Sequence, residues 1–287
     1  MKKNLRIGTI LAISAALLWA VNIIITKFIL RAGENPINII FWITLFALPF
    51  WLGLFLRKRQ EAAKITKKDI WILLAIGIIS TLFIAVVEAF AIKYTPAINY
   101  SFLIRSTLLF TIGFAAIFLG EKITLKKIIL GVLILLGAYL VATGGKVISL
   151  SVGDGLTLLE AALIAFGNTI LGKIATKTMS SQLSSSGSFM FGLLPVIAIT
   201  FLTKSFAFPH TIPLLILLSL LGVISSSIRF RAYEHCSASF LAMTYSLTPV
   251  FVSIIAFFLL GERLTPIQLI GGLLVVSGGV FAEKIKL

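Results

Sequence analysis

Ten apolar runs, each about 20 residues long, constrain the fold of this chain more than any other feature. A helix of about this length crosses the ~30 Å hydrocarbon core of a bilayer. The runs fill about three quarters of the chain, so the connections between them are short and leave no room for a soluble domain. We predict an all-α integral membrane protein with ten transmembrane helices at Ile7–Leu30, Ile37–Leu56, Ile70–Ile92, Ala97–Leu119, Thr124–Thr143, Gly155–Ala175, Leu183–Thr203, Thr211–Ile228, Ala238–Leu260 and Leu264–Ala282.

The composition excludes the other broad classes of protein. Only 12% of the residues are charged and 59% are hydrophobic, whereas an ordinary soluble domain has roughly 25% charged residues. Disorder requires low hydrophobicity. The net charge of +15 would favour nucleic-acid binding only if the cations clustered on a polar surface, so we expect no nucleic-acid partner. One Cys and two His cannot form a disulfide or a zinc-protease motif, and we expect no metal and no cofactor.

The basic residues divide unequally between the two sides of the predicted bundle. The side of the N-terminus receives 18 of the 25 Lys and Arg, in the segments 2–6, 57–68, 122–127, 173–177, 229–231 and 284–286. Short loops rich in Lys and Arg mark the cytoplasmic face. We therefore expect a multi-pass protein of the plasma or inner membrane with both termini in the cytoplasm, and anionic lipid head groups as partners of these flanks.

The sequence also repeats itself. At a shift of 141 residues, the segment 91–140 matches 232–281 at 13 of 50 positions, and Leu119-Gly120-Glu121 falls on Leu260-Gly261-Glu262 without a gap. At a shift of 146 residues, Asn22 falls on Asn168. We predict two five-helix repeats, 1–145 and 146–287, which run through the membrane in opposite senses because five is odd. Inverted repeats are typical of secondary transporters, whose halves rock about a central site.

These motifs resemble a known family. The block Ala-x-x-Tyr/His-x-x-Ala, then Leu-Gly-Glu-Lys/Arg-x-Thr, then two glycines six residues apart, occurs once in each half, and Trp19-Ala20-Val21-Asn22 precedes the first. The chain resembles the EamA-type, ten-helix branch of the drug/metabolite transporter superfamily over nearly its whole length. The resemblance implies alternating-access transport of amino acids, metabolites or drugs, often outward. That family usually has a Pro midway along helices 4 and 9. Pro249 keeps the pattern, whereas Leu108 departs from it.

Three ionisable residues fall deep within the predicted spans. A lone Arg at the depth of Arg105 costs at least ~2.5–3.5 kcal/mol, so it should face a cavity or a partner. Glu88 and Glu160 are predicted in the same outer half of the bilayer. Two interpretations stay open: a structural ion pair, or a substrate site in which Arg105 binds a carboxylate while Glu88 or Glu160 exchanges a proton.

Further polar residues complete the candidate site. Asn22 and Asn168 occupy equivalent positions in the two halves, and Trp19 lies one turn before Asn22. They either form helix–helix hydrogen bonds or line the pathway. Polar residues on helices 4 and 9 either line the same pathway or mark a packing kink at Pro249; they are Tyr100, Ser101, Tyr245 and Thr248.

We therefore expect a secondary active transporter of small organic solutes, an amino-acid or metabolite permease or exporter, as a monomer or a loose homodimer. The alternatives are a multidrug or cation exporter of the same superfamily and, in a different class, an intramembrane enzyme or a scaffold. We expect no enzymatic activity and assign no catalytic residue, because the sequence has no H-E-x-x-H motif, no paired Asp motif and no nucleotide-binding loop.

Overall fold

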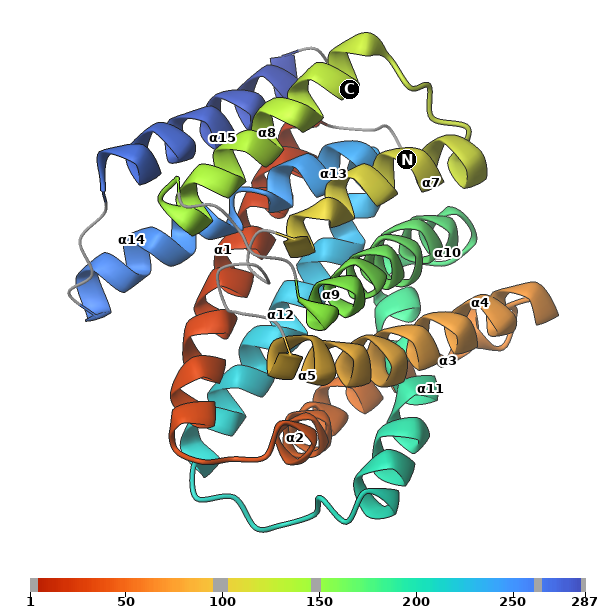
Figure 1. Cartoon of the computed structure of the whole chain (residues 1–287). Helices are drawn as coiled ribbons and strands as arrows, with labels where there is room; N and C mark the ends of the chain where they lie inside the picture. The colour runs from red at the N-terminus through yellow and green to blue at the C-terminus, as the bar shows by residue number, and fades with distance from the viewer. Residues whose placement is uncertain (1–4, 95–102, 146–150, 261–264, 285–287) are drawn as a thin grey trace.

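The computed structural model describes residues 5–94, 103–145, 151–260 and 265–284, and all of its regular secondary structure over these ranges is helical (Figure 1). Each predicted span falls on one helix or on consecutive helical segments. In chain order these are α1 (Leu5–Arg31), α2 (Pro36–Arg57), α3 (Arg59–Ala62), α4 (Lys67–Ile78), η1 (Ile79–Phe83), α5 (Ile84–Tyr94), η2 (Ile104–Ser106), α7 (Thr107–Leu119), α8 (Leu125–Thr143), α9 (Val152–Leu163), η3 (Ile164–Leu171), α10 (Gly172–Thr178), α11 (Ser181–Leu202), α12 (Ile212–His235), α13 (Ala238–Tyr245), α14 (Thr248–Leu260) and α15 (Pro266–Lys284).

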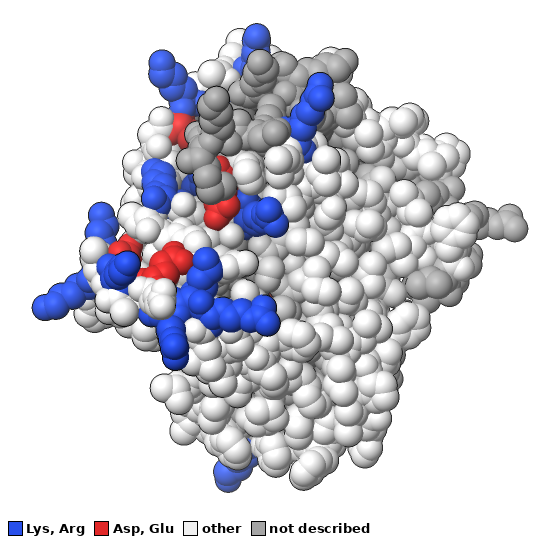
Figure 2. Space-filling model, turned by 180° about the vertical axis from the view of Figure 1, so that it is seen from behind, with Lys and Arg blue, Asp and Glu red and all other residues white. Residues whose placement is uncertain are grey.

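The long apolar helices confirm the membrane class. Six helical stretches of the described chain are long and apolar enough to cross a bilayer, and shorter apolar helices occur at Ile104–Leu119, Ala238–Val252 and Pro266–Gly278. Lys and Arg gather at one side of the molecule, with acidic residues among them, whereas most of the visible face carries no charge (Figure 2). That distribution is the one expected of a protein whose apolar belt lies in lipid.

Local sequence signals set where several helices begin. Asn35 accepts hydrogen bonds from the backbone of Ile37 and Asn38 at the start of α2, and Pro36 occupies its first position. Thr66 and Asp69 form a capping box at α4. Thr124 accepts from the backbone of Lys127 at 3.3 Å. Thr265, which is 141 residues further on, accepts from Gln268 at 3.3 Å in the same way.

Four close helix pairs hold the bundle together: α8 with α15, α1 with α12, α2 with α11 and α5 with α9. The first pair crosses at glycines, as small residues allow in membranes. A Cβ atom on Gly137 would lie 2.7 Å from the Gly271 carbonyl oxygen, and one on Gly271 would lie 2.6 Å from the Gly137 oxygen. These glycines therefore allow α8 and α15 to pack closely.

Three details differ from the sequence expectation. The eighth span was expected to end at Ile228, but α12 continues to His235. The ninth was expected to be one helix, but it is divided into α13 and α14. Wider π-helical turns, η1 and η3, interrupt the third and sixth spans. Apolarity marks where lipid surrounds the chain, whereas backbone hydrogen bonding decides where a helix ends or changes its pitch.

Candidate functional site

Arg105 lies in a 3-10 turn at the start of the described part of the fourth span. The segment η2 is a single turn of 3-10 helix that leads into α7, and the Thr107 hydroxyl donates a hydrogen bond to the Ile104 carbonyl oxygen at 2.6 Å. A 3-10 turn within a helix often marks a hinge or a site under functional constraint. The Arg105 side chain is partly buried there.

The ninth span is interrupted at the equivalent position. α13 ends at Tyr245, α14 begins at Thr248, and the Thr248 hydroxyl donates to the Tyr245 carbonyl oxygen at 2.7 Å. Adding 141 to Ile104 and Thr107 gives Tyr245 and Thr248, so the same side-chain hydrogen bond occurs at equivalent positions of the fourth and ninth spans. In transporters, substrate sites typically form at discontinuous helices.

The structure brings the elements of the predicted charged group together. α9, which carries Glu160, packs against both α5, which carries Glu88, and η2, which carries Arg105. Glu160 is only 2% exposed, and Glu88 is partly buried. Burial of a carboxyl group at a helix junction is costly without a structural or functional use. The three helical segments that carry these residues therefore lie together in the bundle.

Asn168 joins three helical segments. Its side-chain oxygen accepts a hydrogen bond from the Ser80 hydroxyl at 2.5 Å, and its backbone oxygen accepts from the Tyr233 hydroxyl at 2.7 Å. Asn168 lies in η3 and Ser80 in η1, so the two π-helical turns face each other across this bond. At Gly167, a Cβ atom would lie within contact distance of the Ile79 side chain. Segments of π-helix are frequent at functional sites.

The remaining predicted residues are placed differently from one another. Asn22 is 8% exposed and donates to the Leu18 carbonyl oxygen of its own helix at 3.3 Å, so it does not share the interhelical bond of Asn168. Trp19, expected on the same face as Asn22, is 44% exposed. Tyr100 and Ser101 lie outside the described residues.

Sequence reasoning missed Arg229. It was counted among the cations of a cytoplasmic loop, but because α12 continues to His235, Arg229 lies inside the helix. Its Nη2 atom donates to the Ser226 hydroxyl at 3.2 Å, and its guanidinium lies 5.7 Å from the centre of the Phe230 ring. The spacing of Ser225, Ser226, Arg229 and Tyr233 along one helical face was the signal that could have shown it.

Glu121 of the Leu-Gly-Glu-Lys motif connects the two halves of the chain. Its carboxylate accepts hydrogen bonds from the Ala238 backbone at 2.9 Å and from the Ser239 hydroxyl at 2.6 Å, and it pairs with Lys127 at 3.2 Å. Burial favours a raised pKa for Glu121, but these hydrogen bonds and Lys127 outweigh it and hold the pKa below the ordinary value. Glu121 therefore joins the loop after α7 to the start of α13.

Comparison with known proteins identifies the family. The EamA-like transporter family matches two segments of the chain, residues 6–143 and 153–282. The chain belongs to the EamA-like transporter family. It is 24% identical over 238 residues to the pseudopaline exporter CntI of Pseudomonas aeruginosa, covering 82% of each chain. It is 26% identical over 273 residues to an uncharacterized transporter of Archaeoglobus fulgidus, covering 91% of this chain and 92% of that one.

The fold of this EamA-like protein also occurs in a solved structure. A crystal structure covers 97% of this chain, and is itself covered over 98%, with a TM-score of 0.76 at 14% sequence identity. That likeness shows a shared fold. Family membership and the long apolar helices together establish a multi-pass membrane transporter of small solutes. In the described residues, no group of three His, Cys, Asp or Glu side chains is placed to hold a metal ion.

Proposed function

We propose that this EamA-like protein is a secondary active transporter that moves small carboxylate-bearing solutes, amino acids or related metabolites, across the plasma or inner membrane by alternating access. The observation that carries the proposal is the position of Arg105 in the 3-10 turn of the fourth span, against the helix that holds buried Glu160. A cation inside the bundle can hold a carboxylate within the bilayer.

The proposal assigns different roles to the charged residues. Arg105 binds the carboxylate, because a guanidinium presents a planar set of donors that matches a carboxylate. Glu160 and Glu88 exchange a proton as the cavity opens to one side or the other, since a buried carboxyl group changes protonation with its surroundings. Asn168, Asn22, Tyr245 and Thr248 belong to the helices that shape the pathway.

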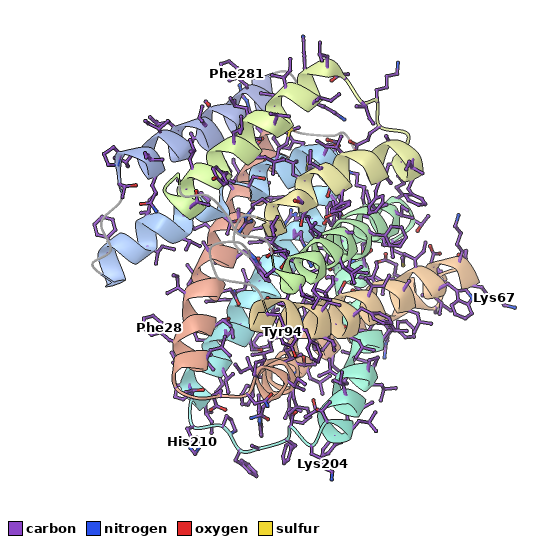
Figure 3. The ribbon with its side chains drawn as sticks, viewed as in Figure 1. Phe28, Lys67, Tyr94, Lys204, His210 and Phe281 are labelled. Atoms are coloured by element: carbon purple, nitrogen blue, oxygen red, sulfur yellow. The ribbon has the colours of Figure 1, made fainter. Side chains whose placement is uncertain are left out.

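Alternating access is proposed from the two halves of the chain. Repeats at 1–145 and 146–287 would run in opposite senses, with both termini in the cytoplasm and one repeat rocking against the other. Support comes from the equivalent hydrogen bonds of Thr107 and Thr248, which lie 141 residues apart, and from the two separate family matches, one in each half. The gathering of Lys and Arg at one side agrees with cytoplasmic termini (Figure 2). In Figure 3, Lys204 and His210 mark the connection that this orientation places outside.

A cation or multidrug exporter of the same family is the competing function. Such a transporter would use Glu88 and Glu160 to bind the cation, and Arg105 would then serve to keep these acids in place. The two functions differ in which ligands they accept. A site anchored by Arg105 prefers carboxylates, whereas a site anchored by the two acids prefers a lipophilic cation.

Counterflow in proteoliposomes tests the proposal. The purified protein is reconstituted into liposomes that are loaded with unlabelled L-amino acids, malate or tetraphenylphosphonium, and exchange with the same labelled compound outside is followed. We expect exchange of at least one carboxylate-bearing solute, loss of that exchange in Arg105→Gln, and an unchanged elution volume and melting curve for that variant. Glu160→Gln should flatten the pH dependence of exchange. Exchange of tetraphenylphosphonium alone, or full carboxylate exchange by Arg105→Gln, would overturn the assignment.

A further inference from the structure

Arg229 lies within α12, and its position differs from that of a loop residue. It lies six residues before His235, the last residue of α12, which is about 9 Å along the helix axis. Tyr245 lies seven residues after Ala238, the first residue of α13, which is about 10 Å. Because α12 and α13 are joined by a short turn, Arg229 and Tyr245 lie at similar distances from that turn along their helices.

The Arg229 side chain extends along α12, away from the end of the helix. Cations near the end of a membrane helix usually extend toward the water at that end. Arg229 instead donates to Ser226, which is one turn further from the end of α12. Arg231, two residues on, is exposed. Extension of the side chain to the nearby water therefore does not account for the direction of Arg229.

The guanidinium keeps donor capacity in this position. Its Nε atom is buried and makes no hydrogen bond within the part of the chain that the structure describes. The same described residues give it no acidic partner at ion-pair distance. The Tyr245 phenol lies within electrostatic reach of Arg229 and close to the Ser225 side chain, whose hydroxyl donates to the Ala15 carbonyl oxygen at 3.3 Å. A buried N–H without an acceptor is costly, so a site of this kind favours an anionic ligand.

The internal repeat relates this cluster to the Arg105 neighbourhood. A shift of 141 residues places Glu88 on Arg229 and Arg105 on Ser246, the residue next to Tyr245. The span that precedes each of these two positions thus carries an ionisable residue at the equivalent place, which is an acid in the first half and a base in the second. The first cluster combines one Arg with two Glu, whereas the described residues of the second provide an Arg with hydroxyl groups.

We propose that Arg229, Ser226 and Tyr245 form a second binding site, for the anionic group of the transported solute, at the end of the pathway nearer the chain termini. This inference rests on the proposed function and adds where the solute binds before it reaches Arg105. A carboxylate held by Arg229 would accept charge-assisted hydrogen bonds from Nε and Nη2 and a further bond from the Tyr245 hydroxyl. At Arg105, the neighbouring Glu88 and Glu160 would compete with the same carboxylate and favour its release.

The test is counterflow of labelled malate and labelled L-glutamate in liposomes of phosphatidylcholine alone. Arg229→Gln should raise the KM by about tenfold or more on the side of the termini, because it removes charge-assisted bonds to the ligand. Arg231→Gln removes the same charge from the same helix and should leave the KM unchanged. Arg229→Lys, which keeps the charge but loses the planar donors, should give an intermediate KM.

The outcomes separate this inference from the proposed function. If the wild type exchanges neither probe, the carboxylate function fails and the second site fails with it. If the wild type exchanges a probe and Arg229→Gln, Arg229→Lys and Tyr245→Phe keep its KM, the second site alone is overturned. If dependence on Arg229 appears only after phosphatidylglycerol is added, the anion at this site is a lipid phosphate, which also overturns the inference. Should Arg229→Gln fail to fold, Arg229→Lys and Tyr245→Phe decide.

Discussion

Replacing Glu121 by Gln should destabilise the folded protein by about 2–3 kcal/mol. The carboxylate is largely buried and accepts hydrogen bonds from Ala238 and Ser239 while it pairs with Lys127. A hydrogen bond to a charged group contributes about 1.5–3 kcal/mol and a neutral one about 1 kcal/mol, so neutralising Glu121 weakens each of these contacts by about 1 kcal/mol. Glu121→Ala should cost about 3–5 kcal/mol, because buried Lys127 then loses its acidic partner altogether.

The sign of the pH dependence follows from the lowered pKa of Glu121. A carboxyl group with a depressed pKa in the folded state stabilises the protein above its unfolded pKa, about 4.3, and loses that effect as the pH falls through the folded value. The stability difference between wild type and Glu121→Gln should therefore be full at pH 7 and shrink below about pH 4.3.

Unfolding in mixed micelles, followed by circular dichroism, measures these differences. Lys122→Gln is the matched control, because Lys122 is the neighbouring residue and its side chain is exposed. The double variant Glu121→Gln/Ser239→Ala should cost less than the sum of the two single variants, since both remove the same bond. A Glu121→Gln protein within about 0.5 kcal/mol of the wild type, or a double variant with additive costs, would refute the reasoning.

Two further substitutions test the packing of the bundle. Lys173 is buried and donates hydrogen bonds to the backbone oxygens of Tyr233 and Cys236 at the end of α12, so Lys173→Met should lower the unfolding free energy by about 2–3 kcal/mol, whereas exposed Lys177→Met should not. Gly271→Ala should force α8 and α15 apart and lower the unfolding free energy by about 1–3 kcal/mol. Gly272→Ala should be neutral, because its Cβ atom would meet only Val250 at 4.0 Å. Equal melting temperatures for the two variants would contradict the crossing geometry.

The membrane class and the positions of the spans could be predicted because the length of an apolar run follows from bilayer thickness. The end of α12 could not, because Arg229 and Arg231 close the apolar run while the helix continues through them. A polar residue ends a hydrophobic pattern without ending backbone hydrogen bonding. The same reasoning placed Arg229 in a loop, so this partly buried cation was not predicted as part of the candidate site.

The contacts of the candidate site were less predictable than its residues. Asn22 and Asn168 are equivalent in sequence, but Asn168 bonds to Ser80 and Asn22 bonds to its own helix. Which partner an amide finds depends on the neighbouring helix and its pitch, and the π-helical turns that bring Ser80 to Asn168 leave no local signature in the sequence. By contrast, the Glu121 contact follows from a motif that recurs in both halves.

The chain departs from the family pattern at Leu108 but keeps one local contact of the equivalent span. Helix 9 has Pro249 after Thr248, whereas helix 4 has Leu108 after Thr107, yet both Thr hydroxyls bond to the carbonyl three residues earlier. Proline is therefore not required for this hydrogen bond. Leu108 is the second residue of α7, directly after the 3-10 turn η2, and the second half shows that a Thr-Pro pair fits this register.

Leu108→Pro should consequently cost less than Ile112→Pro. Both side chains are buried, so both variants lose apolar packing, but Ile112 lies inside α7, where proline removes a backbone bond and clashes with the preceding turn at about 3 kcal/mol or more. We expect Leu108→Pro to remain folded and to retain counterflow, and Ile112→Pro to be destabilised by about 3 kcal/mol more. Equal losses at the two positions would show that the 3-10 turn at Arg105 does not make proline easier to accommodate at Leu108.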